Sequence, residues 1–440
     1  MSNPIANWLR SRKLKSALQS GEVRLAQKLL QDIQKSGAKL SWLEKLFRDK
    51  LKAEEYQQQY KQEVASLSVK LRESSQRIEE LEKRDLSATD NFILQTKAEF
   101  INYISKSFKL IEHDEHKLQA TGIDSRIFDD FEARLVDYLK EEFRKIPPDK
   151  LMIRLEDALD DINSLKSGQD PDYRFSLTPH VYFMKYFLEN VYCIYLAWFL
   201  IYQTELLQTK INILDIASGP GTVAYGLALF LQSLGSFSPP EKPMHISYFS
   251  LEKQDAFQFR GLQFWRRYIE SQKTPINAFF RFVTDDLFTW DSQSSNIPKD
   301  FFDFVVISHC FFLDTTKKQQ ANATYKQIIS NNLKNHGYVL LIVQDKKLWK
   351  TYDFRQAEDQ QQEKNLVLNL AAELGLNIVW YKYLNSTGSR IPLGGGNFAK
   401  FARENLPKQP HLTPLLQQYF GQKYVSHYTL DDYVILAKKY

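Results

Sequence analysis

The chain has 440 residues, enough for two or three domains, and its 58 basic and 53 acidic residues leave a net charge of only +5. Its two cysteines, Cys193 and Cys310, exclude a disulfide framework and a cysteine-rich metal centre, and no metal site is predicted. The first residues lack a signal peptide's apolar core, and the most apolar segment, 191–202, is shorter than the ~20 residues of a membrane span. We therefore expect a cytoplasmic protein without a transmembrane segment.

Residues 1–90 form the first predicted region, a basic helical arm. Its first 52 residues hold 12 Lys and Arg against four Asp and Glu. Apolar residues at helical spacing predict two helices, the first containing Trp8, Leu9, Leu14 and Leu18 and the second spanning 23–33, which dock as a hairpin. A basic helical surface binds nucleic acid, an acidic membrane or an acidic protein, or is simply solvated, so nucleic acid is one candidate partner.

A short coiled coil is expected to follow the hairpin. Apolar residues alternate spacings of four and three over about three heptads, with charged residues between them, at Tyr60, Val64, Leu67, Leu71, Ser74, Ile78 and Leu81. This helix would serve a homodimer, a protein partner or a rigid arm, and the alternative is an intramolecular helical hairpin. Residues 91–175, the second region, read as largely helical.

Residues 176–440 change to an α/β pattern. The segment 211–222, I-N-I-L-D-I-A-S-G-P-G-T, predicts a strand, a glycine-rich turn and the start of a helix. Gly219 and Gly221 let such a loop lie against a ligand, and Asp215 stands at the strand's carboxyl end, where open α/β sheets bind ligands. Gly219, Gly221 and Ala224 also satisfy the dinucleotide-binding spacing, so an NAD-type oxidoreductase is an alternative.

The stretch from Asp215 to Gly221, D-I-A-S-G-P-G, resembles motif I of class I S-adenosylmethionine-dependent methyltransferases, with Ala217 replacing the first glycine and Ser218 within the loop. The resemblance covers about residues 178–440. It implies S-adenosylmethionine as the cofactor and an α/β fold with a seven-stranded Rossmann-like sheet. The strands after the first are expected at 245–251, 279–283, 303–308, 337–343, 377–383 and 433–438, with helical stretches separating the first five.

Acids after the second and third strands strengthen the resemblance. Glu252 follows the second strand, where the family binds both ribose hydroxyls. Asp285 and Asp286 follow the third, where an acid meets the adenine amino group, and strand register favours Asp286. Any one of these acids would equally cap a helix. Acids after three strands in the family's order argue for the methyltransferase and against the oxidoreductase.

The fourth strand ends at Ser308 and His309, a position that borders the transferred methyl group in the resembling family. His309 is the candidate general base because an imidazole titrates near neutrality, and the alternative is a histidine that only closes the pocket. Residues 384–432 form an insertion between the sixth and seventh strands. There, Arg390 and Ser389 would grip an acidic substrate group, unless the insertion is only a surface loop.

The sequence thus predicts a methyltransferase that moves a methyl group from S-adenosylmethionine to an unidentified acceptor, with a small molecule slightly ahead of RNA or protein. The alternative is a non-catalytic S-adenosylmethionine-binding scaffold or assembly factor that works through its N-terminal arm.

Overall fold

The computed structural model describes residues 4–36, 41, 43–45, 47, 93–164, 171, 173, 175–237, 244–272, 276–291, 296–423 and 425–440. The chain divides into two compact units, Met1–Thr89 and Asp90–Tyr440. The predicted coiled coil, at 60–81, lies outside the described residues. Among the helices that are described, none is long and apolar enough to cross a membrane.

The N-terminal unit contains a helical hairpin, as predicted. Helices α1 (Pro4–Gln19) and α2 (Val23–Lys35) pack through a small apolar core formed by Leu14, Ala17, Ala26, Leu30, Ile33 and Phe47. Trp8 and Leu9 are not part of that core, since their exposed fractions are 57% and 48%.

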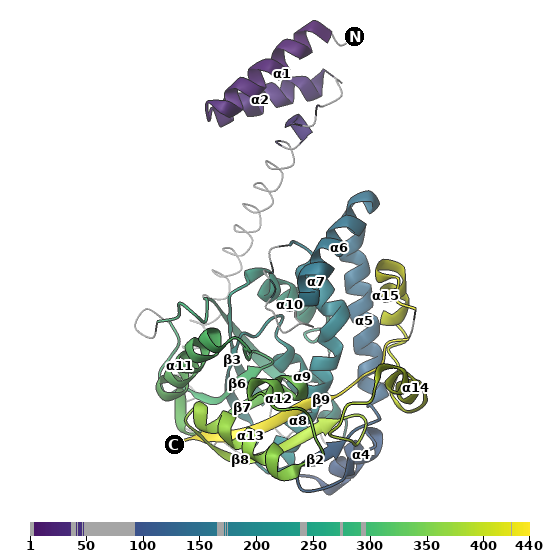
Figure 1. The fold of residues 1–440 in the computed structure, drawn as a ribbon, viewed down its shortest axis with the longest axis vertical. Helices are drawn as coiled ribbons and strands as arrows, with labels where there is room; N and C mark the ends of the chain where they lie inside the picture. Colours follow the sequence, from purple (N-terminus) through teal and green to yellow (C-terminus); the bar gives the residue numbers. More distant parts are fainter. Residues whose placement is uncertain are drawn as a thin grey trace. The chain divides into compact units, whose positions relative to one another are not determined.

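The second unit, shown in Figure 1, is built on one sheet. Its strand order is β1-β2-β8-β9-β7-β6-β3-β4-β5. The strands are β1 (Ile111–Glu112), β2 (Lys117–Gln119), β3 (Lys210–Ile216), β4 (Met244–Glu252), β5 (Ile276–Thr284), β6 (Phe302–Ser308), β7 (Leu333–Gln344), β8 (Leu376–Asn385) and β9 (Asp431–Lys439). The α/β class and all seven expected strands, now β3 to β9, are confirmed. The predicted number of seven is wrong, because β1 and β2 extend the sheet to nine.

Helices cover both faces of this sheet. They are α4 (Ala98–Ser107), α5 (Ser125–Arg144), α6 (Pro148–Asn163), α7 (Thr178–Tyr182), the π-helical η2 (Phe183–Phe187), α8 (Leu188–Gln203), α9 (Thr222–Phe237), α10 (Asp255–Tyr268), α11 (Thr315–Asn332), α12 (Asp345–Thr351), α13 (Gln360–Glu373), α14 (Gly395–Asn405) and α15 (Leu412–Phe420). Alternate residues of a strand enter different cores. Ile213 joins the core with α5, α8 and α9, whereas Leu214 joins the one with α11 and α13.

Strand β3 occupies the point where the chain reverses direction across the sheet. It pairs in parallel with β4 on one side and with β6 on the other. The connections that leave β3 and β6 therefore diverge, and open α/β sheets bind ligands in the crevice that such a divergence creates. Strand β9 runs antiparallel between β7 and β8, so its first residues meet the carboxyl end of β7.

The crossover from β5 to β6 differs from the prediction. Helical stretches were expected between all of the first five strands, but the described parts of this crossover, 285–291 and 296–301, contain turns and no helix. Asp285 and Asp286 explain the start of the turn, because Asp285 accepts the Asp286 N–H at 2.8 Å and Asp286 accepts the Phe288 N–H at 3.1 Å. Such local side-chain bonds compete with helix formation.

Residues 91–175 are less purely helical than predicted, because they also contain β1 and β2. Strand β2 pairs in parallel with β8, with Lys117 opposite Tyr383. The Gln119 side chain donates to the Ser386 carbonyl at 2.9 Å, across 267 positions of the chain. These strands of two and three residues are too short to show an apolar alternation in the sequence.

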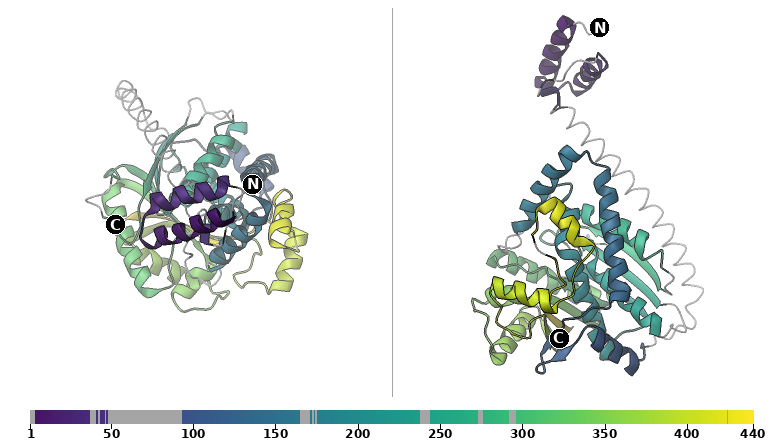
Figure 2. Two further views of the ribbon diagram at one scale, coloured as in Figure 1. Left: turned by 90° about the horizontal axis from the view of Figure 1, so that it is seen from above. Right: turned by 90° about the vertical axis from the view of Figure 1, so that its right-hand side faces the viewer.

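The insertion at 384–432 carries α14 and α15, and α15 lies beside α5 (Figures 1 and 2). Glu132 of α5 is fully buried and accepts the backbone N–H groups of His411 and Leu412, each at 2.8 Å. A carboxylate that accepts the first N–H groups of a helix satisfies donors that have no partner within it. Glu132 therefore fixes the start of α15 on α5.

Candidate active site

A cavity of about 910 Å³ lies at the carboxyl ends of the central strands, at the divergence beside β3. Of the predicted residues, seven line it: Ala217, Gly219, Glu252, Asp285, Asp286, Ser308 and His309. Asp215, Ser218 and Gly221 do not line it.

The loop between β3 and α9 forms one wall and requires left-handed backbone. Gly219 and Gly221 have φ values of +54° and +84°, which a glycine adopts without steric cost. Ala217 has φ +54° and must take the same conformation with a Cβ. The methyltransferase family that the sequence resembles has its first motif glycine at this position. Alanine in place of that glycine therefore leaves the Ala217 backbone strained.

Asp215 lies beneath this loop rather than in the cavity. Its side chain is 1% exposed, and one carboxyl oxygen accepts the Tyr248 hydroxyl. The other oxygen, Oδ1, has no hydrogen-bond partner among the described residues. Burial raises the pKa of the Asp215 carboxyl to about 8. Asp215 therefore does not line the cavity, and its hydrogen bond with Tyr248 connects β3 to β4.

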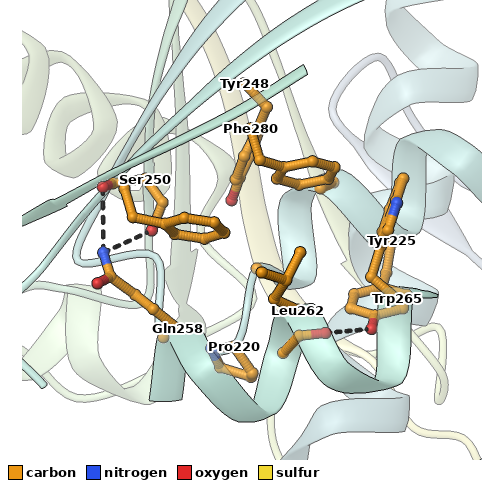
Figure 3. Close-up of a pocket in the computed structure, with 13 residues that line it drawn as sticks. Pro220, Tyr225, Tyr248, Ser250, Gln258, Leu262, Trp265 and Phe280 are labelled. Carbon is orange, nitrogen blue, oxygen red and sulfur yellow. Dashed lines mark hydrogen bonds between the residues drawn. The ribbon is translucent and has the colours of Figure 1, made fainter. Parts of the chain in front are cut away.

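Close packing supports the underside of the loop (Figure 3). Gly261 of α10 approaches so closely that an added Cβ would lie 2.2 Å from the Pro220 carbonyl oxygen. The Tyr225 hydroxyl donates to the Gly261 carbonyl at 2.8 Å, and the Gln258 amide donates to the Ser250 carbonyl at 3.2 Å (Figure 3). The space left there is about 10 Å³, too small for a ligand, so these contacts only hold the loop in place.

Glu252 links the end of β4 to the loop. Its carboxylate accepts the Gly219 N–H at 2.8 Å and the Gln254 N–H at 2.9 Å. Burial raises the pKa of Glu252 above its ordinary value. A carboxylate oxygen accepts more than one hydrogen bond, so this side chain is also able to bind ligand hydroxyls in the cavity.

The acids after β5 have different environments. Asp286 forms an ion pair with Lys253 at 2.8 Å. Burial acts to raise the pKa of Asp286, but the hydrogen bonds from Lys253 and from the Phe288 N–H outweigh it and lower that pKa. Asp285 accepts the neighbouring backbone N–H. Both line the cavity, so the choice between them as ligand residues is still a prediction.

The π-helical turn η2 forms the facing wall. Tyr182, Tyr186, Glu189 and Asn190 line the cavity from the segment around this turn, and Asn190 donates to the Tyr182 hydroxyl at 2.8 Å. A π-helical turn shifts the side-chain register of a helix, and such turns occur at functional sites. Burial raises the pKa of Glu189 to about 8.

His309 lies at the end of β6 in a strained conformation, with φ +59°. Its Nδ1 is 3.0 Å from the Ser308 hydroxyl, and its Nε2 is 3.0 Å from a carboxylate oxygen of Asp432. The backbone N–H of His309 donates to the Ile342 carbonyl at 2.8 Å, which fixes the turn against β7. When Asp432 accepts the Nε2–H, Nδ1 carries the lone pair of the ring and accepts the Ser308 hydroxyl.

Asp432 is a functional candidate that the sequence interpretation missed. It lies 123 positions after His309, at the start of β9. The antiparallel direction of β9 brings its first residues to the edge where the parallel strands end. The pair Asp431–Asp432 before the last strand was the available signal. Asp431 also lines the cavity, accepts the Tyr383 hydroxyl at 2.7 Å and has its pKa raised to about 6 by burial.

Aromatic and basic side chains also line the cavity. Phe288 and Phe312 meet edge to face with ring centroids 5.1 Å apart. Four lysines from α11 and α12 are part of the lining: Lys317, Lys346, Lys347 and Lys350.

Arg390 does not belong to the cavity, contrary to the prediction that it grips a substrate. Its side chain is 2% exposed and donates to Glu363 at 2.5 Å and to Asp114 at 2.8 Å. Ser389 donates to Glu358 at 2.8 Å. Arg390 binds the buried Glu363 and the partly exposed Asp114, so it joins the insertion to α13 and to the segment between β1 and β2.

No family model and no curated protein matches the chain. Solved structures similar to it include a SAM-dependent methyltransferase of Methanosarcina mazei, with 16% identity over 54% of this chain and 96% of that chain, and a TM-score of 0.31. A loganic acid methyltransferase with SAH has 10% identity over 61% and 97% of the two chains, and a TM-score of 0.30. The fibrillarin pre-rRNA processing protein of Methanococcus jannaschii has 10% identity over 52% and 67%, and a TM-score of 0.29. With TM-scores of 0.29 to 0.31, these structures carry no argument here, and the architecture described for this chain depends on its own strand order and on the loop after β3.

Proposed function

We propose that residues 176–440 form a methyltransferase domain that uses S-adenosylmethionine to methylate an acceptor still to be identified. The observation that carries the proposal is the bond from the Gly219 N–H to Glu252, which joins a left-handed loop after one strand to an acid at the end of the next. This pair faces the same cavity as His309 and Asp432. A cofactor wall and a paired base thus share one crevice.

The residues present suit this cofactor. A cavity of about 910 Å³ is within the range of cavities that hold ligands of this size. Glu252 would accept hydrogen bonds from the ribose hydroxyls, Asp285 or Asp286 would meet the adenine side, and Ala217 and Gly219 would contact the cofactor through the loop. Asp215, Ser218 and Gly221 would keep that loop in shape from behind. A sulfonium beside Glu189 would favour the ionised form of this carboxyl group, whose pKa burial raises to about 8 in the protein without a ligand.

S-adenosylmethionine supplies a methyl group that is already activated by its positively charged sulfur. The remaining task of the protein is to orient the acceptor and to take its proton. In the proposal, Asp432 holds His309 with Nε2 protonated, and Nδ1 takes the proton of an acceptor hydroxyl or ammonium group. The Ser308 hydroxyl, 3.0 Å from Nδ1, lines the cavity beside it.

Calorimetric titration with S-adenosylmethionine and with S-adenosylhomocysteine tests the cofactor. We expect both to bind, and Glu252→Gln to weaken each by about 10- to 100-fold, since hydrogen bonds to a charged acceptor contribute about 1.5–3 kcal/mol. Asp160→Asn, an exposed change of the same type on α6, should bind like the unchanged protein. A folded, monodisperse protein that binds neither compound would refute the proposal.

A further inference from the structure

The short helix α12 presents a row of lysines on one side. Leu348 and Trp349 are 1% exposed and anchor the helix to the core, which leaves Lys346 and Lys350, one helical turn apart, on its outer side. Both lysines line the cavity, together with Lys347 of the same helix. Lys317, in the first turn of α11, adds a fourth cation from a second element.

Lys346 and Lys350 differ from the other charged residues that line this cavity. Lys253 is paired with Asp286, and Asp432 is bound to His309. Lys346 and Lys350 form no ion pair with any residue in the described part of the chain. Two unpaired ammonium groups one helical turn apart repel each other, and an anion bound between them relieves this repulsion.

Lys346 and Lys350 lie close to His309, the proposed base. The His309 N–H is bonded to the Ile342 carbonyl, and β7 ends at Gln344, directly before α12. Two strand residues and the first residue of α12 separate Ile342 from Lys346, which places the two backbones roughly 10 Å apart. A molecule that spans this distance reaches both His309 and the lysines. The aromatic side chains of Phe311 and Phe312 line the same cavity.

We infer that the methyl acceptor carries an anionic group, a carboxylate or a phosphate, which Lys346 and Lys350 bind while the reacting atom lies at His309. The inference rests on the proposed function and adds the substrate class. The aromatic rings of Phe311 and Phe312 in the cavity suit an acceptor with a flat, apolar body between the anionic group and the reacting atom. The lysines would determine which acceptor is methylated, and they take no part in the transfer itself.

The test uses protein saturated with S-adenosylhomocysteine and two pairs of probes. One pair is 4-hydroxybenzoate and the neutral 4-hydroxybenzamide, and the other is uridine 5′-monophosphate and the neutral uridine. We expect at least one anion to bind about tenfold more tightly than its neutral counterpart, and that pair identifies the source of the charge as carboxylate or phosphate. The preference should weaken as salt rises, because both ions are partly exposed.

The variant K346A/K350A should lose that preference and bind the anion about tenfold more weakly, with its affinity for S-adenosylhomocysteine unchanged. K140A/K364A removes the same charge from exposed positions on α5 and α13 and should behave like the unchanged protein. Equal binding of anions and neutral counterparts, or an unchanged anion affinity in K346A/K350A, would overturn the inference while leaving the cofactor site intact. If S-adenosylhomocysteine itself does not bind, the proposed function fails and the inference fails with it.

Discussion

Replacing Asp215 with Asn should make protein stability less dependent on pH. The Asp215 side chain is 1% exposed, its Oδ1 has no hydrogen-bond partner in the described part of the chain, and Oδ2 accepts the Tyr248 hydroxyl. Burial raises the pKa of this carboxyl from 3.8 to about 8. An asparagine has nearly the same shape and never ionises, so the exchange removes the titration and keeps the packing.

The sign of the effect follows from the two pKa values. In the unfolded chain Asp215 loses its proton above about pH 4, whereas in the folded protein it keeps the proton up to about pH 8. Its contribution is therefore fully present at low pH and is lost progressively as the pH rises from 4 to 8. At about 1.4 kcal/mol for each pKa unit, the free energy of unfolding falls by at most about 5 kcal/mol over this range.

Urea denaturation of Asp215→Asn and of the unchanged protein at pH 5, 6, 7 and 8 measures this difference. We expect the variant's advantage to grow steadily, from about 1 kcal/mol at pH 5 to several at pH 8, with unchanged denaturant slopes. A constant offset from the new amide group does not alter that trend. Asp160→Asn, at an exposed site, serves as the control. A stability difference that stays flat from pH 5 to pH 8 would refute the reasoning.

Three further changes test other parts of the fold. Ala217→Gly removes a Cβ at φ +54°, and the relief of roughly 1–2 kcal/mol should exceed the entropy cost of glycine and raise the Tm slightly; a clear fall in Tm would contradict this. Glu132→Ala leaves the N–H groups at the start of α15 unpaired, so stability should fall by about 1–3 kcal/mol and limited proteolysis should cut faster within 384–432, a result that unchanged cleavage would exclude. Arg390→Met leaves the fully buried Glu363 without its cation and should cost about 3–5 kcal/mol in denaturant titrations, whereas a loss below 1 kcal/mol would argue against a buried ion network.

The strands that bear the site could be predicted because each is long, apolar and followed by a polar residue. Expected strand 303–308 corresponds to Phe302–Ser308, and expected strand 245–251 to Met244–Glu252. Burial on both faces produces such runs in parallel strands, and their order in the chain fixes which ends share an edge. That is why the sequence alone predicts that Glu252 and His309 lie near one crevice.

Features that depend on distant partners could not be predicted in the same way. Asp432 reaches His309 only because β9 pairs antiparallel with β7. The residues near Asp432 in the sequence do not indicate that His309 is its partner. Arg390 resembles a ligand residue in the sequence because it stands in a glycine-rich stretch. In the structure it donates instead to Glu363 and Asp114, two carboxylates on other segments of the chain. Local patterns encode periodicity and turns, whereas a buried charge is explained only by the groups that surround it.

The pairing of β2 with β8 has a consequence for how the chain is made. Gln119 donates to the carbonyl of Ser386, which lies 267 positions later in the chain. At roughly 5–20 residues per second, a ribosome synthesises Ser386 about 13–50 s after Gln119. Throughout that interval the early hairpin has no sheet to join. Its two-residue outer strand, β1, then becomes the border of the finished sheet and offers little backbone for pairing with another molecule. The hairpin of β1 and β2 is thus synthesised early but joins the sheet only after β8 has been made, and it then forms one edge of the sheet.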